Sequence, residues 1–348
     1  MLQPLSPSSS RWHPAALGLA ALAFSTGVEA QSDPAPNTTL TAGGDGAVVD
    51  VDGDTFFALA EHRWSRPVIW PLHAPSGVPV TRSWPMQDEV EAERDHPHQR
   101  SLWFAHGDVD GVDFWTEGRG SGRVELDGRS RSTLDEHGRV VSTAQHRWVD
   151  STGKLVCRDA RTWTAHVDGA GRHLRLDVTL RALPERPLHL GDTKEGTFGL
   201  RLHPALRLEG KVATGHYLDA EGRTDRAVWG KRARWVAASG TVDGHAVGLV
   251  VMDHPRNLRH PTWWHARPYG LLAANPFGAH DFEGAPEGSG DHEVPAGQEL
   301  ALTYGVFLFE GVPDPEHIEK VWRAFADAAA ESPDADGRTD APRRRGGP

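Results

Sequence analysis

Alternation of hydrophobic and polar residues recurs along the middle of the chain. Over residues 173–182, leucine and valine occupy every second position and polar residues lie between them. This period of two is typical of a strand with one buried face and one wet face. Two similar stretches, residues 139–149 and 154–167, come before it, and the gaps between the three carry Asp and Gly. The pattern predicts consecutive antiparallel hairpins.

Further short strands are predicted where apolar or β-branched runs lie between turn-forming residues: 47–51, 55–62, 68–72, 123–126, 197–203, 245–252 and 299–309. No helical pattern separates these segments. We therefore predict a mainly β fold, a large antiparallel β-sandwich. One C-terminal helix is expected, with Asp314 as its cap, Pro315 at its first position and an apolar stripe that includes Ile318 and Phe325. We expect this helix to pack on the sandwich or to cover a sheet edge.

The two ends of the chain predict segments outside this domain. Arg11 precedes a short apolar run over residues 15–24, and Ala30 completes a small-residue cleavage pattern. We predict a signal peptide over residues 1–30, a flexible leader over 31–44, a single β-sandwich domain over 45–331 and a disordered tail over 332–348. The apolar run is shorter than a spanning helix needs, and an uncleaved anchor is the alternative. We expect a periplasmic or secreted protein without membrane contact after signal cleavage.

Composition narrows the partners of the protein. The net charge of −11 argues against nucleic acid, which requires a basic surface. Tryptophan is frequent, with 13 residues against 3 tyrosines, and its ring serves both cores and ligand platforms. The single cysteine, Cys157, lies in a predicted strand and is expected to be a buried core thiol. We expect a small molecule or a glycan as the partner.

The first polar cluster begins at residue 95 with Asp-His-Pro-His-Gln-Arg. In an extended chain His96 and His98 would project to the same side, where two imidazoles can bracket a polar ligand or bind one metal ion. Pro97 lacks a backbone N–H, so this run is expected in a loop or an edge strand. Three further candidate residues follow: Arg100, Trp103 and His106. The alternative is a turn with incidental histidines.

The second cluster is a short segment between glycines, residues 191–196, which contains Asp192, Lys194 and Glu195. A lysine beside carboxylates changes their proton affinity, and carboxylates are the usual general acids and bases of sugar chemistry. A strand is predicted directly after it. Glu195 is therefore expected at a strand end, where sites often gather. The alternative is a charged surface turn.

The third cluster covers residues 253–278, directly after a predicted apolar strand. It combines flat rings with charged donors in a segment with little regular pattern, which suits a polyhydroxylated or carboxylated ligand. Its candidate residues are His254, Trp264, His265, Arg267, Tyr269 and Asn275. Trp263 and Trp264 would face opposite ways on a strand, so at most one of them needs to line a site. In the alternative, both rings fill the core and the rest forms turns.

The three clusters resemble a family of secreted bacterial proteins of unknown function that is labelled methane oxygenase PmoA-like. The resemblance is carried by residues 95–115, 191–196 and 253–278 and spans roughly residues 51–311. It implies a mutarotase-like supersandwich and a setting beside polysaccharide-degrading enzymes. Two positions depart from the family pattern, because Gln99 replaces a common histidine and Asp110 replaces a common asparagine. A neutral amide is a poor metal ligand, so Gln99 weakens a metal site there.

The label names a subunit of a membrane-embedded copper oxygenase. Such a subunit needs several spanning helices, and after residue 30 this sequence has no apolar segment of that length. The label therefore carries no mechanism for this chain. We expect no cofactor, with a divalent metal as the alternative.

Together these patterns predict a carbohydrate-active enzyme with carboxylate and histidine acid–base chemistry. The predicted catalytic residues are His96, His98, His106, Asp192, Glu195 and His265. Glu195 or Asp192 would be the general acid or base, with His98 or His265 as proton-transfer partner. Arg100 and Arg267 would orient the ligand, and Trp103 or Trp264 would stack on it, with Lys194, His254, Tyr269 and Asn275 as further binding residues. Two alternatives remain, a non-catalytic glycan-binding protein and a metal-dependent oxygenase.

Overall fold

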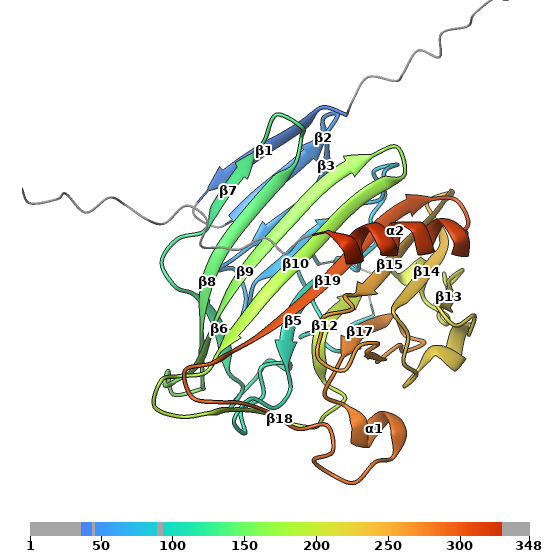
Figure 1. Ribbon diagram of the computed structural model, residues 1–348. Coiled ribbons are helices and arrows are strands. Elements are labelled where there is room, and N and C mark those ends of the chain that lie inside the picture. Colours follow the sequence, from blue (N-terminus) through green and yellow to red (C-terminus); the bar gives the residue numbers. More distant parts are fainter. Residues whose placement is uncertain (1–35, 44–45, 89–92, 329–348) are drawn as a thin grey trace, which may run out of the picture. The chain divides into compact units, whose positions relative to one another are not determined.

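Two large antiparallel sheets lie face to face in the computed structural model, which describes residues 36–43, 46–88 and 93–328 (Figure 1). The eight-stranded sheet has the spatial order β1 (Thr38–Gly43), β2 (Gly46–Val51), β3 (Asp54–Ala60), β4 (Val68–Leu72), β5 (Leu102–His106), β12 (Gly196–Arg201), β17 (Leu271–Asn275) and β16 (Trp263–Trp264). The described residues belong to one compact unit.

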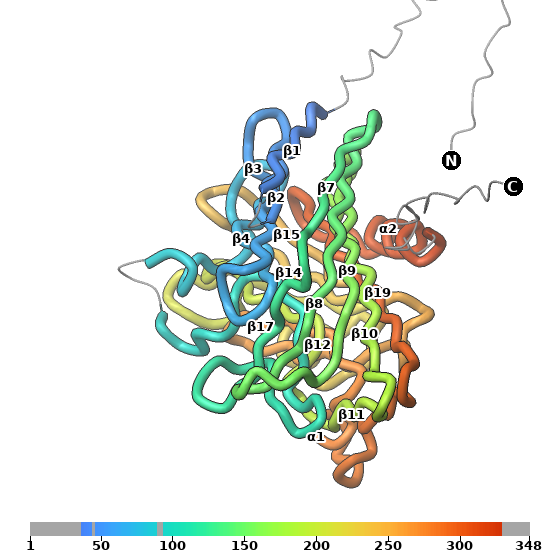
Figure 2. The backbone as a smooth tube through the Cα atoms, turned by 90° about the vertical axis from the view of Figure 1, so that its left-hand side faces the viewer, coloured from blue at the N-terminus to red at the C-terminus, as the bar shows by residue number. Residues whose placement is uncertain are grey.

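The nine-stranded sheet has the order β13 (His216–Asp219), β14 (Trp235–Val242), β15 (His245–Asp253), β19 (Glu299–Glu310), β10 (Gly171–Arg181), β9 (Leu155–Asp168), β8 (Val140–Val149) and β6 (Arg123–Leu126), and β7 (Arg131–Leu134) also pairs with β8. Figure 2 shows the two layers edge-on, with β1–β4 in one and β7–β10 in the other. Strands β11 (Leu188–Leu190) and β18 (His292–Val294) form a small separate sheet.

The predicted hairpins β8–β9 and β9–β10 are confirmed. Their turns are held by aspartates, as the sequence pattern requires. Asp150 accepts hydrogen bonds from the backbone N–H groups of Thr152 and Lys154, and Asp168 does the same for Ala170 and Gly171. A carboxylate that satisfies the N–H groups of a tight turn fixes its length, and thereby the register of the two strands.

The core lies between the two sheets and is filled by aromatic side chains from both. Phe198 of β12 stacks on Tyr304 of β19, with ring centroids 4.9 Å apart. Phe104 of β5 meets Trp148 of β8 at 6.3 Å. Each of these rings is essentially inaccessible to water. Full burial of side chains of this size is the main stabilising term of the sandwich.

The C-terminal helix is confirmed as α2 (Pro315–Asp327). The Asp314 carboxylate accepts from the backbone N–H of Glu316, and Pro315 occupies the first turn. Its apolar face, with Ile318, packs on the outer face of β14, β15 and β19, where Trp235 and other apolar side chains lie. Figure 1 shows α2 in front of these strands. The helix therefore packs on the sandwich, as expected.

Some elements differ from expectation. Part of the segment expected as a flexible leader forms strand β1, which pairs with β2 along its whole length. A short helix, α1 (Ala279–Glu283), and two 3-10 turns, Pro204–Leu206 and Asp225–Val228, have no counterpart in the sequence pattern. The predicted signal peptide and C-terminal tail lie outside the described residues. Among the residues that are described, no helix combines the length and the apolar character needed to cross a membrane.

Candidate functional site

The three polar clusters meet at the central strands of the eight-stranded sheet. The loop over residues 95–101 leads into β5, residues 191–195 lead into β12, and residues 265–270 connect β16 to β17. Because β12 pairs with β5 on one side and with β17 on the other, these three segments become neighbours. Phe198 points to the other sheet, so its neighbour Gly199 faces outward and packs under the rings of Trp103 and Trp115. The site therefore lies on the outer face of this sheet.

Glu195 lies directly before β12, at the predicted strand end. Its backbone C=O accepts from the N–H of Gly107 at 2.6 Å, which fixes the loop against the end of β5. Its side chain is 32% exposed, and the nearest charged atom is Nζ of Lys194, 4.0 Å away. Burial raises the pKa of Glu195 above its ordinary value, against the opposing effect of Lys194. Within the described part of the chain, its carboxylate accepts no hydrogen bond.

His265 follows β16 and is almost fully buried. Its Nδ1 lies 3.0 Å from the backbone C=O of Lys194. A carbonyl only accepts, so Nδ1 carries the proton and Nε2 of the neutral ring is left as an acceptor. Burial, with the positive charge of Arg267, lowers the pKa of His265 to about 3. The ring is therefore a neutral hydrogen-bond acceptor at ordinary pH.

His96 lies in a turn with φ of 44°, so this run is a loop, one of the two forms expected for it. The turn brings the rings of His96 and His98 to 5.8 Å. His96 stacks on Tyr269 at 4.8 Å, and its Nδ1 lies 2.7 Å from the Asp95 carboxylate. Burial and the charge of Arg66 lower the pKa of His98 to about 4. His96 interacts electrostatically with both Glu195 and His265, so members of all three clusters lie close together.

Two cations complete the cluster. The guanidinium of Arg267 lies 5.7 Å from the ring of Tyr269 and, among the described residues, has no carboxylate partner. Its buried Nε makes no hydrogen bond. Lys194 is 3.9 Å from Asp281 and remains 45% exposed at its side chain. A guanidinium without a carboxylate partner is suited to bind the hydroxyl or carboxylate groups of a ligand.

A buried ion-pair network positions the His96 loop. Arg201 of β12 donates two hydrogen bonds to Asp95, at 2.8 and 3.0 Å, and one to Gln99 at 2.5 Å. Its guanidinium also lies 4.6 Å from the ring of Tyr269. Gln99, which departs from the family pattern, thus serves as a structural acceptor for Arg201.

Several predicted site residues have structural partners instead. Arg100 donates two hydrogen bonds to the Glu117 carboxylate, one to each oxygen, at 2.7 and 2.9 Å. Asp192 accepts from the backbone N–H groups of His280 and Gly290 and so braces the loop around α1. The guanidinium of Arg100 and the carboxylate of Asp192 therefore already have hydrogen-bond partners within the protein.

Two further predicted residues hold the floor of the site. His106 is fully buried, with Nε2 donating to the C=O of Gly191 at 2.9 Å, and burial lowers its pKa to about 4. Asn275 is also buried and donates to the C=O of Thr193 at 2.7 Å. Both side chains anchor the loop over residues 191–195 from below. Their contacts are those of positioning residues.

His254 and the two tryptophans lie apart from Glu195. His254 accepts from the N–H of Arg256 and donates to the C=O of Ala326, beside α2 on the other sheet. Trp264 is fully buried and donates to the C=O of Ala233, while Trp103 is fully buried and packs on Gly199. Neither indole presents a face to solvent. Trp263 and Trp264 do point in opposite directions, into two different apolar clusters.

Two residues of the site were not singled out from the sequence. Arg201 belongs to no recognisable motif. An arginine in a predicted apolar strand nevertheless indicates a buried charge, and a buried charge requires an acidic partner. Asp281 accepts from the backbone N–H of Lys194 at 2.8 Å and lies on α1, for which the sequence pattern gives no signal.

The predicted metal alternative can be compared with the donor atoms present. Across the described residues, the group whose three ligand atoms lie within 4.8 Å of one another is His166, Asp168 and His173, on the nine-stranded sheet. Glu195 and its neighbouring histidines do not form such a group. The donor set at the eight-stranded sheet therefore suits proton transfer better than metal binding.

Solved structures with a similar arrangement have low sequence identity. The Slr1438 protein from Synechocystis sp. PCC 6803 has 12% identity and a TM-score of 0.35, over 80% of this chain and 97% of that chain. An α-galactosidase from Lactobacillus brevis has 8% identity and a TM-score of 0.39, over 79% and 39%. A protein from Escherichia coli K12 described as an aldose 1-epimerase has 12% identity and a TM-score of 0.32, over 79% and 100%. At these TM-scores the likenesses carry no argument about activity.

Among functionally curated proteins, no sequence matches this chain. None of the comparisons bears on the resemblance to the PmoA-like proteins, which stays an expectation. One family profile matches across residues 47–323, which include every strand from β3 to β19 and most of α2. The chain belongs to this family of unknown function, DUF6807.

Proposed function

We propose that this protein is a carbohydrate-active enzyme that transfers protons at a sugar or sugar derivative, with Glu195 and His96 as its acid–base pair. One observation carries the proposal. Glu195 is a half-buried carboxyl group with a raised pKa, and no structural hydrogen bond within the described residues occupies it. A raised pKa brings a carboxyl group closer to neutral pH, where a general acid or base is most effective.

Within the described ranges, the aspartates near Glu195 have partners in the fold. Asp95 binds two arginines, Asp113 accepts from the backbone N–H groups of Trp115 and Thr116, and Asp192 braces α1. Hydrolysis of a glycosidic bond by the common route needs two available carboxyl groups. Among the residues that the structure describes, one available carboxyl group lies beside histidines, which favours a reaction that moves protons, such as epimerisation or elimination.

Among the histidines, His96 is the best partner for Glu195. Its Nδ1 lies 2.7 Å from the Asp95 carboxylate, which orients the ring. Burial keeps His98 and His265 neutral, with pKa values of about 4 and about 3. In the proposed step Glu195 removes a proton from the substrate, and His96 donates a proton to the oxygen on which negative charge develops.

Neighbouring groups would orient the substrate. Nε2 of His265 is an acceptor for a hydroxyl group, and Arg267 is a donor for a hydroxyl or a carboxylate. Tyr269 keeps its proton, because burial raises the pKa of its phenol above the ordinary value. These three side chains surround the pair from the β16–β17 side.

The test is a screen of sugars, sugar acids and oligosaccharides by NMR, which detects both product formation and exchange of substrate protons with deuterated water. For any substrate found, Glu195→Gln and His96→Gln should each lower kcat by at least about a hundredfold and leave ligand binding intact. His137→Gln is the matched control, because His137 is 82% exposed and lies on the other sheet. Wild-type rates in both site variants would contradict the assignment. Glycan binding without turnover by the wild type would favour the non-catalytic binding protein.

A further inference from the structure

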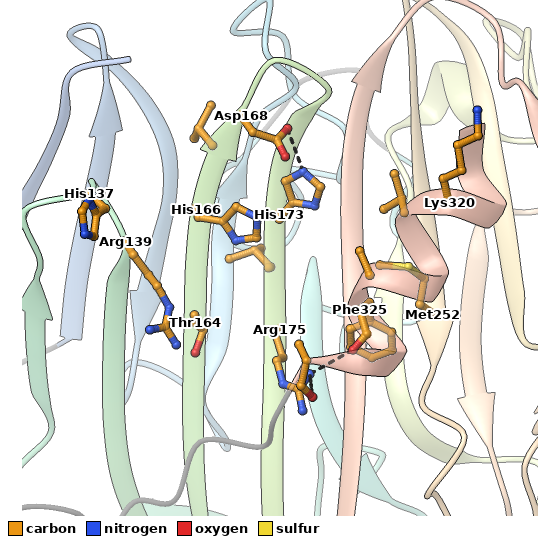
Figure 3. A pocket seen from close by; sticks show the side chains of 15 residues that line it. His137, Arg139, Thr164, His166, Asp168, His173, Arg175, Met252, Lys320 and Phe325 are labelled. Atoms are coloured by element: carbon orange, nitrogen blue, oxygen red, sulfur yellow. Dashed lines mark hydrogen bonds and ion pairs between the residues drawn. The ribbon is translucent and has the colours of Figure 1, made fainter. Parts of the chain in front are cut away.

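A second group of histidines lies on the outer face of the nine-stranded sheet, beside α2. It borders a cavity of about 780 Å³ between β9, β10 and the helix (Figure 3). His166 of β9 and His173 of β10 are directly opposite each other in the strand register. Asp168 lies at the start of the turn that joins these strands. No part of the proposed acid–base site includes these residues.

The three side chains converge. The rings of His166 and His173 are stacked, with centroids 4.3 Å apart and planes within 3° of parallel. Nε2 of His173 lies 3.1 Å from Oδ1 of Asp168. One donor atom from each of the three residues lies within 4.8 Å of the other two. Figure 3 shows both rings and the carboxylate gathered at this end of the hairpin.

The chemistry of the three side chains suits a cation. Two imidazoles and one carboxylate form a donor set typical of zinc and related divalent ions.

We propose that His166, His173 and Asp168 bind one divalent transition-metal ion of the zinc type, with an open coordination position toward the cavity. Zinc bonds of about 2.0 Å place tetrahedral ligand atoms about 3.3 Å apart, so the donors must close by rotation. His166 is exposed and makes no hydrogen bond within the described residues, so rotation of its ring breaks its stacking on His173 but no hydrogen bond. Oδ1 of Asp168 caps the turn, which leaves Oδ2 for the metal.

The cavity suggests what completes the coordination. Its opposite wall is α2, with Phe325 and Lys320, and Met252 also lines it (Figure 3). Arg175 is neutralised by a bidentate pair with Asp177, at 2.7 and 2.9 Å. Lys320 and Arg139 supply positive charge to a space that is also lined by apolar side chains. A carboxylate-bearing molecule with an apolar body fits this arrangement, its carboxylate on the metal and near Lys320.

The test uses tag-free, full-length protein that has been stripped with EDTA and dialysed. Titration calorimetry with ZnCl2 should show one saturable site, and Co²⁺ should give the visible absorption of a histidine-bound complex. His166→Ala and His173→Ala should each weaken Zn²⁺ binding by at least about tenfold. His137→Ala is the control, because His137 lines the same cavity outside the donor group.

Three outcomes separate the interpretations. Loss of affinity in both site variants, with a wild-type unfolding midpoint for His166→Ala, supports the site. Equal Zn²⁺ binding by the wild type and both variants would assign the metal to scattered surface histidines and overturn the proposal. Absence of any saturable Zn²⁺ or Co²⁺ binding by the wild type would overturn it as well. In that case the stacked rings are hairpin packing against Phe307, which lies 4.8 Å from His173.

Discussion

Replacement of Asp159 by asparagine should destabilise the protein more than any change at its charged surface. Asp159 lies on β9 in the core, where Oδ1 accepts from Nδ1 of His146 at 2.8 Å. Its Oδ2 accepts from Nε1 of Trp148 at 2.7 Å and from two nitrogens of Arg161 at 2.7 and 3.0 Å. Glu61 accepts from the other nitrogen of His146 at 2.9 Å. Every one of these side chains is buried.

The magnitude follows from these contacts. The asparagine has no charge, so Arg161 becomes a buried cation whose only ion pair among the described residues is lost. The amide NH2 group of this asparagine must also face side chains that donate hydrogen bonds. Removal of one partner from a buried ion pair costs about 3–5 kcal/mol. At an m-value of about 3 kcal/mol/M, the urea midpoint should fall by about 1–2 M.

The pH dependence gives a second readout. Burial opposes protonation of His146, but Asp159 and Glu61 raise its pKa above the ordinary 6.5, so its contribution is complete below pH 6.5 and is lost as pH rises through the raised value. The pKa of Asp159 is held below its ordinary 3.8, against burial, by Arg161 and His146. Its contribution is lost as pH falls through that lowered value. The gap in unfolding free energy between wild type and Asp159→Asn should therefore be widest between about pH 4 and pH 6.5.

The matched control is Glu125→Gln. Glu125 pairs with Arg147 at 3.1 Å and with Arg123 at 3.3 Å, and all three side chains are more than one third exposed. Such surface pairs contribute about 1 kcal/mol or less. Urea unfolding followed by circular dichroism compares the two variants. If Asp159→Asn loses no more stability than Glu125→Gln, the buried network does not stabilise the fold as argued.

Three further predictions follow from other parts of the fold. Gly199→Ala should lose about 1–3 kcal/mol in urea unfolding, because the new Cβ would lie 2.7 Å from the rings of both Trp103 and Trp115; unchanged stability would refute this packing. Cys157 should react with a thiol reagent only after denaturation, because its thiol is buried and burial raises its pKa; rapid labelling of native protein would contradict this. With any substrate found, kcat/KM should fall at acidic pH through a pKa above 4.5, since Glu195 must be ionised to act as a base, and a profile flat down to pH 4.5 would exclude that role.

The local pattern of polar and apolar residues is sufficient to predict the elements that have one solvent-exposed face. The β8–β9–β10 hairpins and α2 were readable because alternation, turn aspartates and a cap each leave a short-range signal. Strands β5 and β17 are missing from the prediction. Every residue in both is buried, so no alternation of polar and apolar positions marks them. The pairing that brings them beside β12 joins residues far apart in the sequence, which no local signal encodes.

The candidate site was predicted in part for the same reason. Glu195 was placed correctly at a strand end because the strand after it was readable. His254 and His265, close in the sequence, separate because β15 and β16 belong to different sheets. The expectation that Trp103 or Trp264 stacks on the ligand rests on residue type alone. Large rings gain more from full burial, and both were taken into packed interiors.

The edge strands of the two sheets determine where one copy of the protein could pair with another. A free strand edge is a template for pairing with another chain, and short edge strands suppress such growth. The eight-stranded sheet ends on one side in β16, which has 2 residues, and β13 and β6 at the borders of the nine-stranded sheet have 4 each. Strand β1, with 6 residues, is the long border that remains. Polymerisation by strand addition, if conditions drive it, should therefore start at β1, and a charged residue introduced there should slow it.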